Sequence, residues 1–135
     1  MAQNDPQSCV LLVEDDPDIR LVTRLLLETQ YGVRVIESVD GTDALELAQR
    51  ENPSLILMDL ILPTMTGFEI SRSIHYNGPT RHIPIILVSD RCWDVKIQMK
   101  AREIGLVGWV DKSHLVEQLP TQVAPFLGEP VTGKI

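Results

Sequence analysis

Apolar residues in this chain gather in short runs that alternate with stretches of more mixed composition. The runs at residues 9–13, 55–58 and 83–88 are almost unbroken and are shorter than a typical helix. Such runs favour strands that are buried on both faces, as in the middle of a parallel sheet. Residues 33–38 and 107–110 are also strand-like. The pattern therefore predicts five strands.

The stretches between these strands carry apolar residues at helical spacing. The first predicts a helix over residues 17–30, because Pro17 suits the first helical turn and Gly32 is a typical stop. Thr42 is a plausible cap for a second helix, which should break at residues 52–53. Each helix should bury its apolar face against the sheet.

Two further helices follow in the second half of the chain. Thr66 and Glu69 have the spacing of a capping box, so a helix should run from there to about residue 75. We expect a loop at residues 77–79. The next helix should close at Gly105, because glycine readily ends a helix.

A fifth helix, for which Ser113 is a plausible cap, should end the fold. Pro120 falls inside it, removes a backbone hydrogen bond and clashes with the preceding turn, so we expect a break or restart near Leu119. The alternation of strands and helices predicts an α/β fold. We expect a doubly wound five-stranded parallel sheet, with right-handed crossovers and helices on both faces.

Size and charge limit the functions that this chain can have. It has 135 residues, the size of one domain, and a formal net charge of −7. An acidic balance argues against nucleic acid or a membrane as direct partner, because anionic partners of this kind need a basic surface. The sequence indicates no signal peptide or membrane span, and the spacing of its two cysteines fits neither a zinc site nor a disulfide framework. The simplest expectation is a cytoplasmic protein.

Polar residues directly follow four of the five predicted strands. They are Glu14 and Asp15 after the first strand, Asp59 after the third, Ser89 after the fourth and Lys112 after the fifth. Parallel strands bring their carboxyl ends to one edge of a sheet, where open α/β folds bind ligands. We therefore expect three carboxylates, a hydroxyl and an ammonium group in one cleft, a combination that packing does not explain.

These residue types together suit the transfer of a phosphoryl group. Neighbouring carboxylates raise one another's pKa unless a cation lies between them. Mg²⁺ suits such a site, because it binds one or two carboxylates together with phosphate oxygens. Lys112 and Ser89 add partners for phosphoryl oxygens. Asp59 would act as nucleophile and form an acyl phosphate, a known covalent role of aspartate.

The motifs around these residues resemble those of the response-regulator receiver domain of two-component signalling. They are LLVEDD at 11–16, LMDLxLPxMxG at 57–67, PIILVS at 84–89 and GWVDK at 108–112. The resemblance covers about residues 8–127 and implies a flavodoxin-like fold. Residues 1–7 would form an N-terminal extension and residues 128–135 a C-terminal tail.

The resemblance also implies a mechanism. A histidine kinase or histidine phosphotransfer protein would phosphorylate Asp59 in a reaction that depends on Mg²⁺ or Mn²⁺, and the altered surface would change binding to a downstream protein. The implied roles are metal binding by Asp15, Glu14, Asp59 and the backbone carbonyl of Ile61, a phosphoryl contact by Lys112, and a switch formed by Ser89 and Trp109. A homodimer is another partner that the resemblance implies.

Four residues depart from the common pattern of such domains. Asp90 stands where a small residue usually follows the switch hydroxyl, and its carboxylate should repel an incoming phosphoryl group and slow phosphorylation. Ser113 replaces a frequent proline. Trp109 is larger than the usual tyrosine or phenylalanine, a size at which the ring can lock inward or outward. Pro120 lies near the usual dimer face and leaves the dimer mode open.

Other functions compete with a phosphorylated switch. One is a receiver-like scaffold that binds proteins without phosphorylation, for which Asp90 and Trp109 argue. Another is a Mg²⁺-dependent phosphohydrolase, which is disfavoured because Ile61 stands where haloacid-dehalogenase-like phosphatases have a second acid. A flavin-binding flavodoxin is weaker still, since acids follow the first strand instead of a phosphate loop. We expect no enzyme activity beyond self-catalysed phosphoryl acceptance and autodephosphorylation.

Overall fold

The computed structural model describes residues 8–131, in which strands and helices alternate. The strands are β1 (Cys9–Val13), β2 (Arg34–Ser38), β3 (Leu55–Asp59), β4 (Ile85–Ser89) and β5 (Gly108–Asp111). The helices are α1 (Pro17–Tyr31), α2 (Ala44–Glu51), α3 (Gly67–His75), α4 (Val95–Ile104) and α5 (Leu115–Leu127), with two short 3₁₀ helices, η1 (Gly78–Thr80) and η2 (Lys112–His114). All five predicted strands are present, and none of the described helices is long and apolar enough to cross a membrane.

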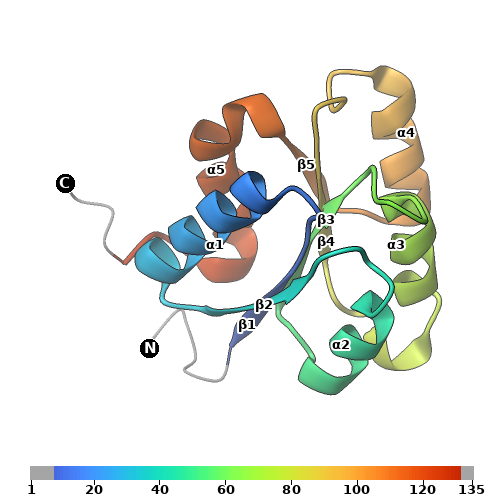
Figure 1. Cartoon of the computed structure of the whole chain (residues 1–135), viewed down its shortest axis with the longest axis horizontal. Coiled ribbons are helices and arrows are strands. Elements are labelled where there is room, and N and C mark those ends of the chain that lie inside the picture. Colours follow the sequence, from blue (N-terminus) through green and yellow to red (C-terminus); the bar gives the residue numbers. More distant parts are fainter. Residues whose placement is uncertain (1–7, 132–135) are drawn as a thin grey trace.

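The five strands form one parallel sheet in the order β2-β1-β3-β4-β5. Helices α1 and α5 cover one face of this sheet, and α2, α3 and α4 cover the other (Figure 1). The fold class predicted from the sequence is therefore confirmed. The expected N-terminal extension at residues 1–7 and the last four residues of the expected tail lie outside the described part of the chain.

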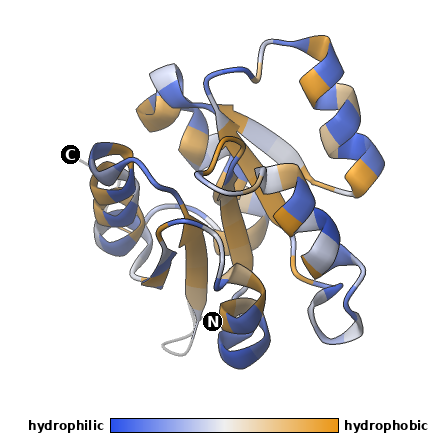
Figure 2. Ribbon diagram, turned by 45° about the vertical axis from the view of Figure 1, so that its right-hand side comes forward, coloured by the Kyte–Doolittle hydropathy of each residue, from blue (hydrophilic) through white to orange (hydrophobic). Residues whose placement is uncertain are grey.

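Two apolar clusters, one on each face of the sheet, form the core. The cluster on the side of α1 and α5 includes Leu27 and Leu119, and the cluster on the other side includes Ile74 and Ile104. β1, β3 and β4 are buried along their whole length. This explains why their sequences are continuously apolar where an exposed sheet would alternate (Figure 2).

Helix α1 begins beside the carboxyl end of β1 because Asp16 caps it. The Asp16 carboxylate accepts hydrogen bonds from the backbone N–H groups of Asp18 and Ile19. Such a cap satisfies amides that have no partner inside the helix, and the negative charge is favourable at this end. At the start of α3, Thr66 and Glu69 form the predicted capping box, with bonds of 3.2 and 2.8 Å.

The predicted break in the last helix is wrong. α5 continues through Pro120, with Leu115, Leu119 and Val123 buried along one side. An interior proline costs about 3 kcal/mol. Burying each large apolar side chain returns roughly 1.5–3 kcal/mol, so the buried face of α5 outweighs the proline.

Two predicted helix caps are also wrong. Ser113 does not cap α5; its N–H and hydroxyl both donate to Asp111 Oδ1, within η2. Thr42 does not cap α2; its N–H and hydroxyl donate to Asp40 Oδ1. In both places the predicted residue lies one position before the N-cap, which is Asp43 in α2 and His114 in α5, and its hydroxyl is directed toward a nearby aspartate. The loop expected at residues 77–79 overlaps the 3₁₀ helix η1 (Gly78–Thr80).

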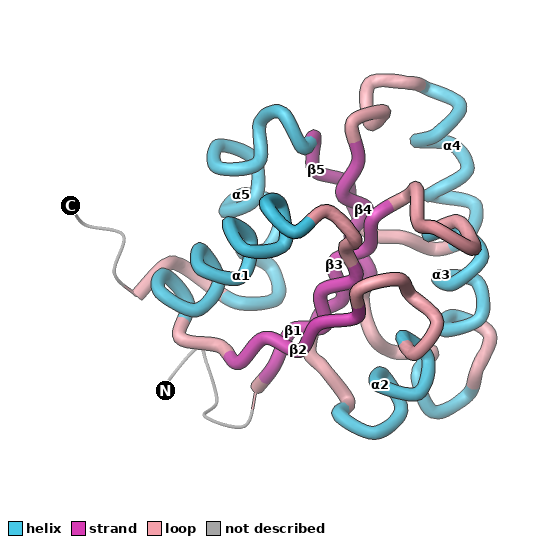
Figure 3. Tube along the Cα trace, viewed as in Figure 1, coloured by secondary structure: helices cyan, strands magenta, loops and turns pink. Residues whose placement is uncertain are grey.

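The sheet topology brings distant parts of the chain together at one edge. In the registers of neighbouring strands Val13 pairs with Met58, and Ser89 pairs with Asp111. The loops that follow β1, β3, β4 and β5 therefore leave the sheet on the same side (Figure 3). These loops carry the polar residues singled out in the sequence.

Candidate functional site

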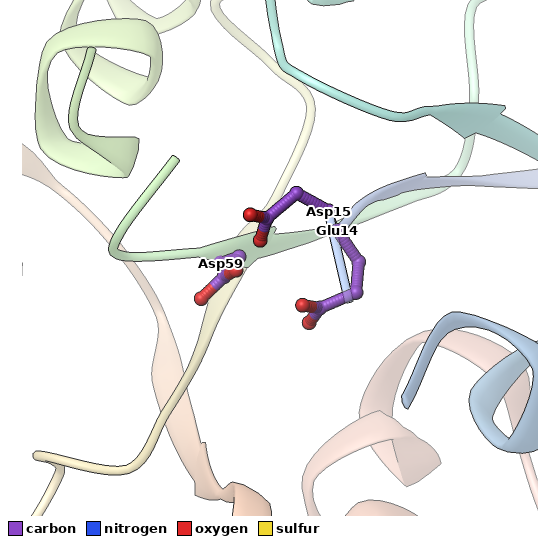
Figure 4. Close-up of side chains that lie close together, drawn as sticks. All are labelled: Glu14, Asp15 and Asp59. Atoms are coloured by element: carbon purple, nitrogen blue, oxygen red, sulfur yellow. The ribbon is translucent and has the colours of Figure 1, made fainter. Parts of the chain in front are cut away.

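Three carboxylates meet at this edge of the sheet. One oxygen each from Glu14, Asp15 and Asp59 lies within 4.8 Å of the others. Glu14 and Asp15 come from the end of β1 and Asp59 from the end of β3, and Figure 4 shows the three side chains gathered at one point. This is the cluster that the sequence predicts, and its oxygens are close enough to share one hard cation.

The backbone of Glu14 is held by two hydrogen bonds at the end of β1. Glu14 is only 1% exposed. Its N–H donates to Ser38 O of β2 at 3.1 Å, and its carbonyl accepts a bond from Arg20 Nη1 at 3.0 Å. The backbone of Glu14 is thus fixed, so its carboxylate is directed toward the other acids.

Lys112, which directly follows β5, contacts the buried carboxyl groups of both Glu14 and Asp59. Its Nζ lies 2.9 Å from Glu14 Oε2 and 3.0 Å from Asp59 Oδ1. Burial lowers the pKa of the ammonium group, but the bonds and charges of Glu14 and Asp59 outweigh that effect and hold the pKa above its usual value. Lys112 is therefore charged and is already engaged by both acids.

Asp59 has an unusual environment for an acid. Its side chain is almost completely buried, and burial together with the nearby Glu14 raises the pKa of Asp59 to about 8, although Lys112 acts in the opposite direction. Its Oδ2 atom is buried and has no hydrogen-bond partner among the described residues. A buried acceptor without a partner is costly, so this oxygen is suited to a ligand that supplies the missing contact.

A cleft of about 270 Å³ opens above Asp59. Six of the residues predicted from the sequence line it: Asp15, Asp59, Ile61, Ser89, Asp90 and Lys112. Ile61 is 62% exposed at its rim. The Oγ atom of Ser89 accepts a hydrogen bond of 2.9 Å from the N–H of Arg91, so the hydroxyl is held by the loop that follows β4.

Trp109 is not part of this cleft. It lies on β5, half-buried, and packs against the core cluster beside α4. Arg102 of α4 lies over its ring, 5.4 Å from the ring centre, at a distance that allows a cation–π contact. The ring of Trp109 is therefore already packed against the fold.

Two other features of the site were not recognised from the sequence. Asp16 and Arg91 also line the cleft, and each adds a charge at its mouth. Gly67 lies against the backbone of Asp59 so closely that a Cβ atom would collide with Asp59 O and approach Met58. The only signal for Gly67 was its place in the motif that begins at Leu57, and nothing in the sequence marked Arg91.

The chain matches the family of response regulator receiver domains over residues 10–124. The match covers most of the chain, so the protein belongs to this family. The resemblance seen in the motifs is confirmed. Receiver domains interact with histidine kinases and downstream targets, bind Mg²⁺ at an acidic pocket, and are in general not enzymes themselves.

The relatives differ greatly in length. The polar-differentiation response regulator DivK of Brucella anthropi is 30% identical over 120 residues, which cover 89% of this chain and 96% of DivK. Sensor histidine kinase TmoS of Ectopseudomonas mendocina is 32% identical over 127 residues, which cover 94% of this chain but 13% of TmoS. The chain therefore matches a small part of the longest relatives.

A solved receiver structure supports the comparison of the sites. The receiver domain of a sensor histidine kinase from Pseudomonas aeruginosa PAO1 has a TM-score of 0.78 and 27% sequence identity to this chain. The match covers 90% of this chain and 98% of that domain, which is described with a magnesium ion coordinated in its active-site cleft. The acids of the present chain gather in the cleft of the same fold.

Proposed function

We propose that this protein is a phosphorylation-dependent signalling switch in which Asp59 accepts the phosphoryl group. The observation that carries the proposal is the setting of Asp59, which is buried between Glu14 and Lys112 with one oxygen that has no hydrogen-bond partner within residues 8–131. A carboxylate placed only for packing would have both oxygens satisfied. The proposed donor is a phosphohistidine of a histidine kinase or histidine phosphotransfer protein.

In this reaction a carboxylate oxygen of Asp59 attacks phosphorus and forms a new P–O bond. The P–N bond of the phosphohistidine breaks, and its electron pair stays on the ring nitrogen of the donor. Before attack the carboxyl group must lose its proton, which its raised pKa otherwise retains at neutral pH. Lys112 lies within ion-pair distance of the reacting carboxylate and is placed to balance charge on the phosphoryl oxygens.

The acidic residues fit a bound Mg²⁺ or Mn²⁺. Glu14, Asp15 and Asp59 offer oxygens at suitable spacing, and Ile61, whose backbone carbonyl we propose as a further ligand, lines the same cleft. When bound, such a cation would lower the pKa of the carboxyl groups and neutralise charge on the phosphoryl oxygens. Of Glu14 and Asp15, Asp15 would be the more direct ligand, because Glu14 is engaged by Lys112.

The output of the switch would begin at Ser89. Its hydroxyl lines the cleft and accepts a bond from the following loop, so a phosphoryl group on Asp59 would compete for it. We propose that a movement of Ser89 alters the packing of Trp109 and thereby the surface offered to a downstream protein. We assign the switch to residues 8–127, flanked by an extension (1–7) and a tail (128–135), and place it in the cytoplasm.

The test of the proposed function is phosphorylation of the purified protein by acetyl phosphate, with and without Mg²⁺, followed by intact mass. The expected result is a Mg²⁺-dependent gain of one phosphoryl group in the wild type and none in Asp59→Asn. If the wild type gains nothing although it binds Mg²⁺, the function is a scaffold that works without phosphorylation. A gain that persists in Asp59→Asn would show that another residue is the acceptor.

A further inference from the structure

The positive charge that faces the cleft comes from two residues with different surroundings. Lys112 is engaged by Glu14 and Asp59, at 2.9 and 3.0 Å, so its charge is already balanced. Arg91 also lines the cleft, but its side chain makes no hydrogen bond or ion pair with any residue of the range 8–131. Arg91 is thus the cation of the cleft that is free to bind an incoming anion.

The cleft needs such a cation because its walls are acidic. Asp15, Asp16, Asp59 and Asp90 all line it, and the whole chain has a net charge of −7. A phosphate dianion that approaches this surface is repelled by carboxylates of the same sign. A free guanidinium at the mouth would offset that repulsion.

The position of Arg91 is fixed by the fold. Its N–H donates to Ser89 Oγ at 2.9 Å, so its backbone is tied to the end of β4. Arg91 is exposed and lines the cleft together with the neighbouring Asp90. The guanidinium group keeps its positive charge throughout the physiological pH range, so it can attract a phosphate dianion.

We propose that Arg91 recruits the phosphate group of the phosphodonor at the mouth of the cleft and offsets the charge of Asp90. This inference rests on the proposed function, since it assigns a binding residue to the same site. It concerns the approach of the donor and leaves the acceptor, Asp59, unchanged. The ligand chemistry is a phosphate dianion, either on a small acyl phosphate or on a phosphohistidine.

The test compares the second-order rate of phosphorylation by acetyl phosphate in the wild type, Arg91→Gln and Arg91→Lys at low ionic strength. We expect Arg91→Gln to react about tenfold more slowly, because one favourable charge is lost, and Arg91→Lys to react at nearly the wild-type rate. In high salt the difference should shrink to about twofold, because ions screen exposed charges. Arg81→Gln is the matched control, since Arg81 is exposed before β4 at the opposite edge of the sheet.

Two further measurements separate recruitment of phosphate from a change in the shape of the site. With phosphoramidate, whose protonated nitrogen offsets part of the phosphate charge and whose P–N bond resembles that of phosphohistidine, the loss in Arg91→Gln should be smaller. Binding of Mg²⁺ alone, measured by calorimetry, should be no weaker in Arg91→Gln than in the wild type, because a cation has been removed from the site.

The proposal is overturned if Arg91→Gln reacts as fast as the wild type, or if Arg91→Lys is as slow as Arg91→Gln. A loss of Mg²⁺ affinity equal to the loss of rate would also overturn it, because Arg91 would then act on the acidic residues. These outcomes are distinct from failure of the proposed function. In that case the wild type itself would accept no phosphoryl group.

Discussion

Replacing Asp59 with asparagine should make the metal-free protein more stable. The raised pKa of Asp59, about 8, shows that the native fold disfavours its ionised form, which lies beside Glu14 in a buried setting. The unfolded chain ionises near the usual value of 3.8, so the native state binds more protons than the unfolded state between these two values. The contribution of Asp59 to the free energy of unfolding is therefore fully present below about pH 4 and is lost as the pH rises toward 8.

The size of the effect follows from the same pKa. Between the usual pKa of 3.8 and pH 7, each pH unit costs at most about 1.4 kcal/mol of stability. The destabilisation caused by Asp59 at pH 7 therefore has an upper limit of about 4 kcal/mol. Asp59 borders an open cleft, so solvent screens part of this cost. We therefore expect Asp59→Asn to raise the free energy of unfolding by about 2 kcal/mol. The gain should increase between pH 5 and pH 8.

The assay is urea unfolding of both proteins in a metal chelator at pH 5, 6, 7 and 8. Asp40→Asn is a control that should lower the free energy of unfolding. Hydrogen bonds from the backbone and hydroxyl of Thr42 hold the pKa of Asp40 below its usual value, so the native fold favours the ionised form. Adding Mg²⁺ should stabilise the wild type more than Asp59→Asn. The reasoning is refuted if Asp59→Asn is no more stable than the wild type at pH 8, or if its gain does not change with pH.

Three further predictions follow from the cleft and its supports. Asp90→Ala should accept phosphate from acetyl phosphate about three- to tenfold faster, because one like charge leaves the mouth of the cleft; an equal or slower rate would remove this role. In a Trp93→Phe background, the fluorescence of Trp109 should change when Asp59 is phosphorylated, and an unchanged signal would mean that the ring is locked in place by its contact with Arg102. Gly67→Ala should destabilise the fold by about 3 kcal/mol in thermal unfolding, because the new Cβ would collide with the Asp59 backbone. Gly78→Ala is the control: its Cβ meets open space, so stability should change by less than about 0.5 kcal/mol. Similar losses in the two variants would contradict this account.

The sequence by itself determined the fold class and most of the residues that line the site. Buried parallel strands must be continuously apolar, so β1, β3 and β4 were visible as runs of apolar residues. Because parallel strands end at one edge, the polar residues that follow them had to meet there. Glu14, Asp15, Asp59 and Lys112 were therefore predictable as neighbours without any coordinates.

The tertiary structure decided how these neighbours are connected. Lys112 and Glu14 are 98 positions apart, and their ion pair depends on side-chain directions that no local pattern encodes. The same holds for the Oδ2 oxygen of Asp59 and the side chain of Arg91, neither of which has a hydrogen-bond partner in the described part of the chain, although both residues line the cleft.

Local rules failed where packing or a competing neighbour was stronger than the local preference. Pro120 should have broken α5, but the helix buries a continuous apolar face against the sheet. Ser113 and Thr42 should have capped helices, but each lies one position before the N-cap residue, and its hydroxyl donates to a neighbouring carboxylate instead. Sequence periodicity shows which surfaces are buried. Whether a local preference, such as a helix break at proline or a cap at serine, prevails over packing is decided only when distant segments meet.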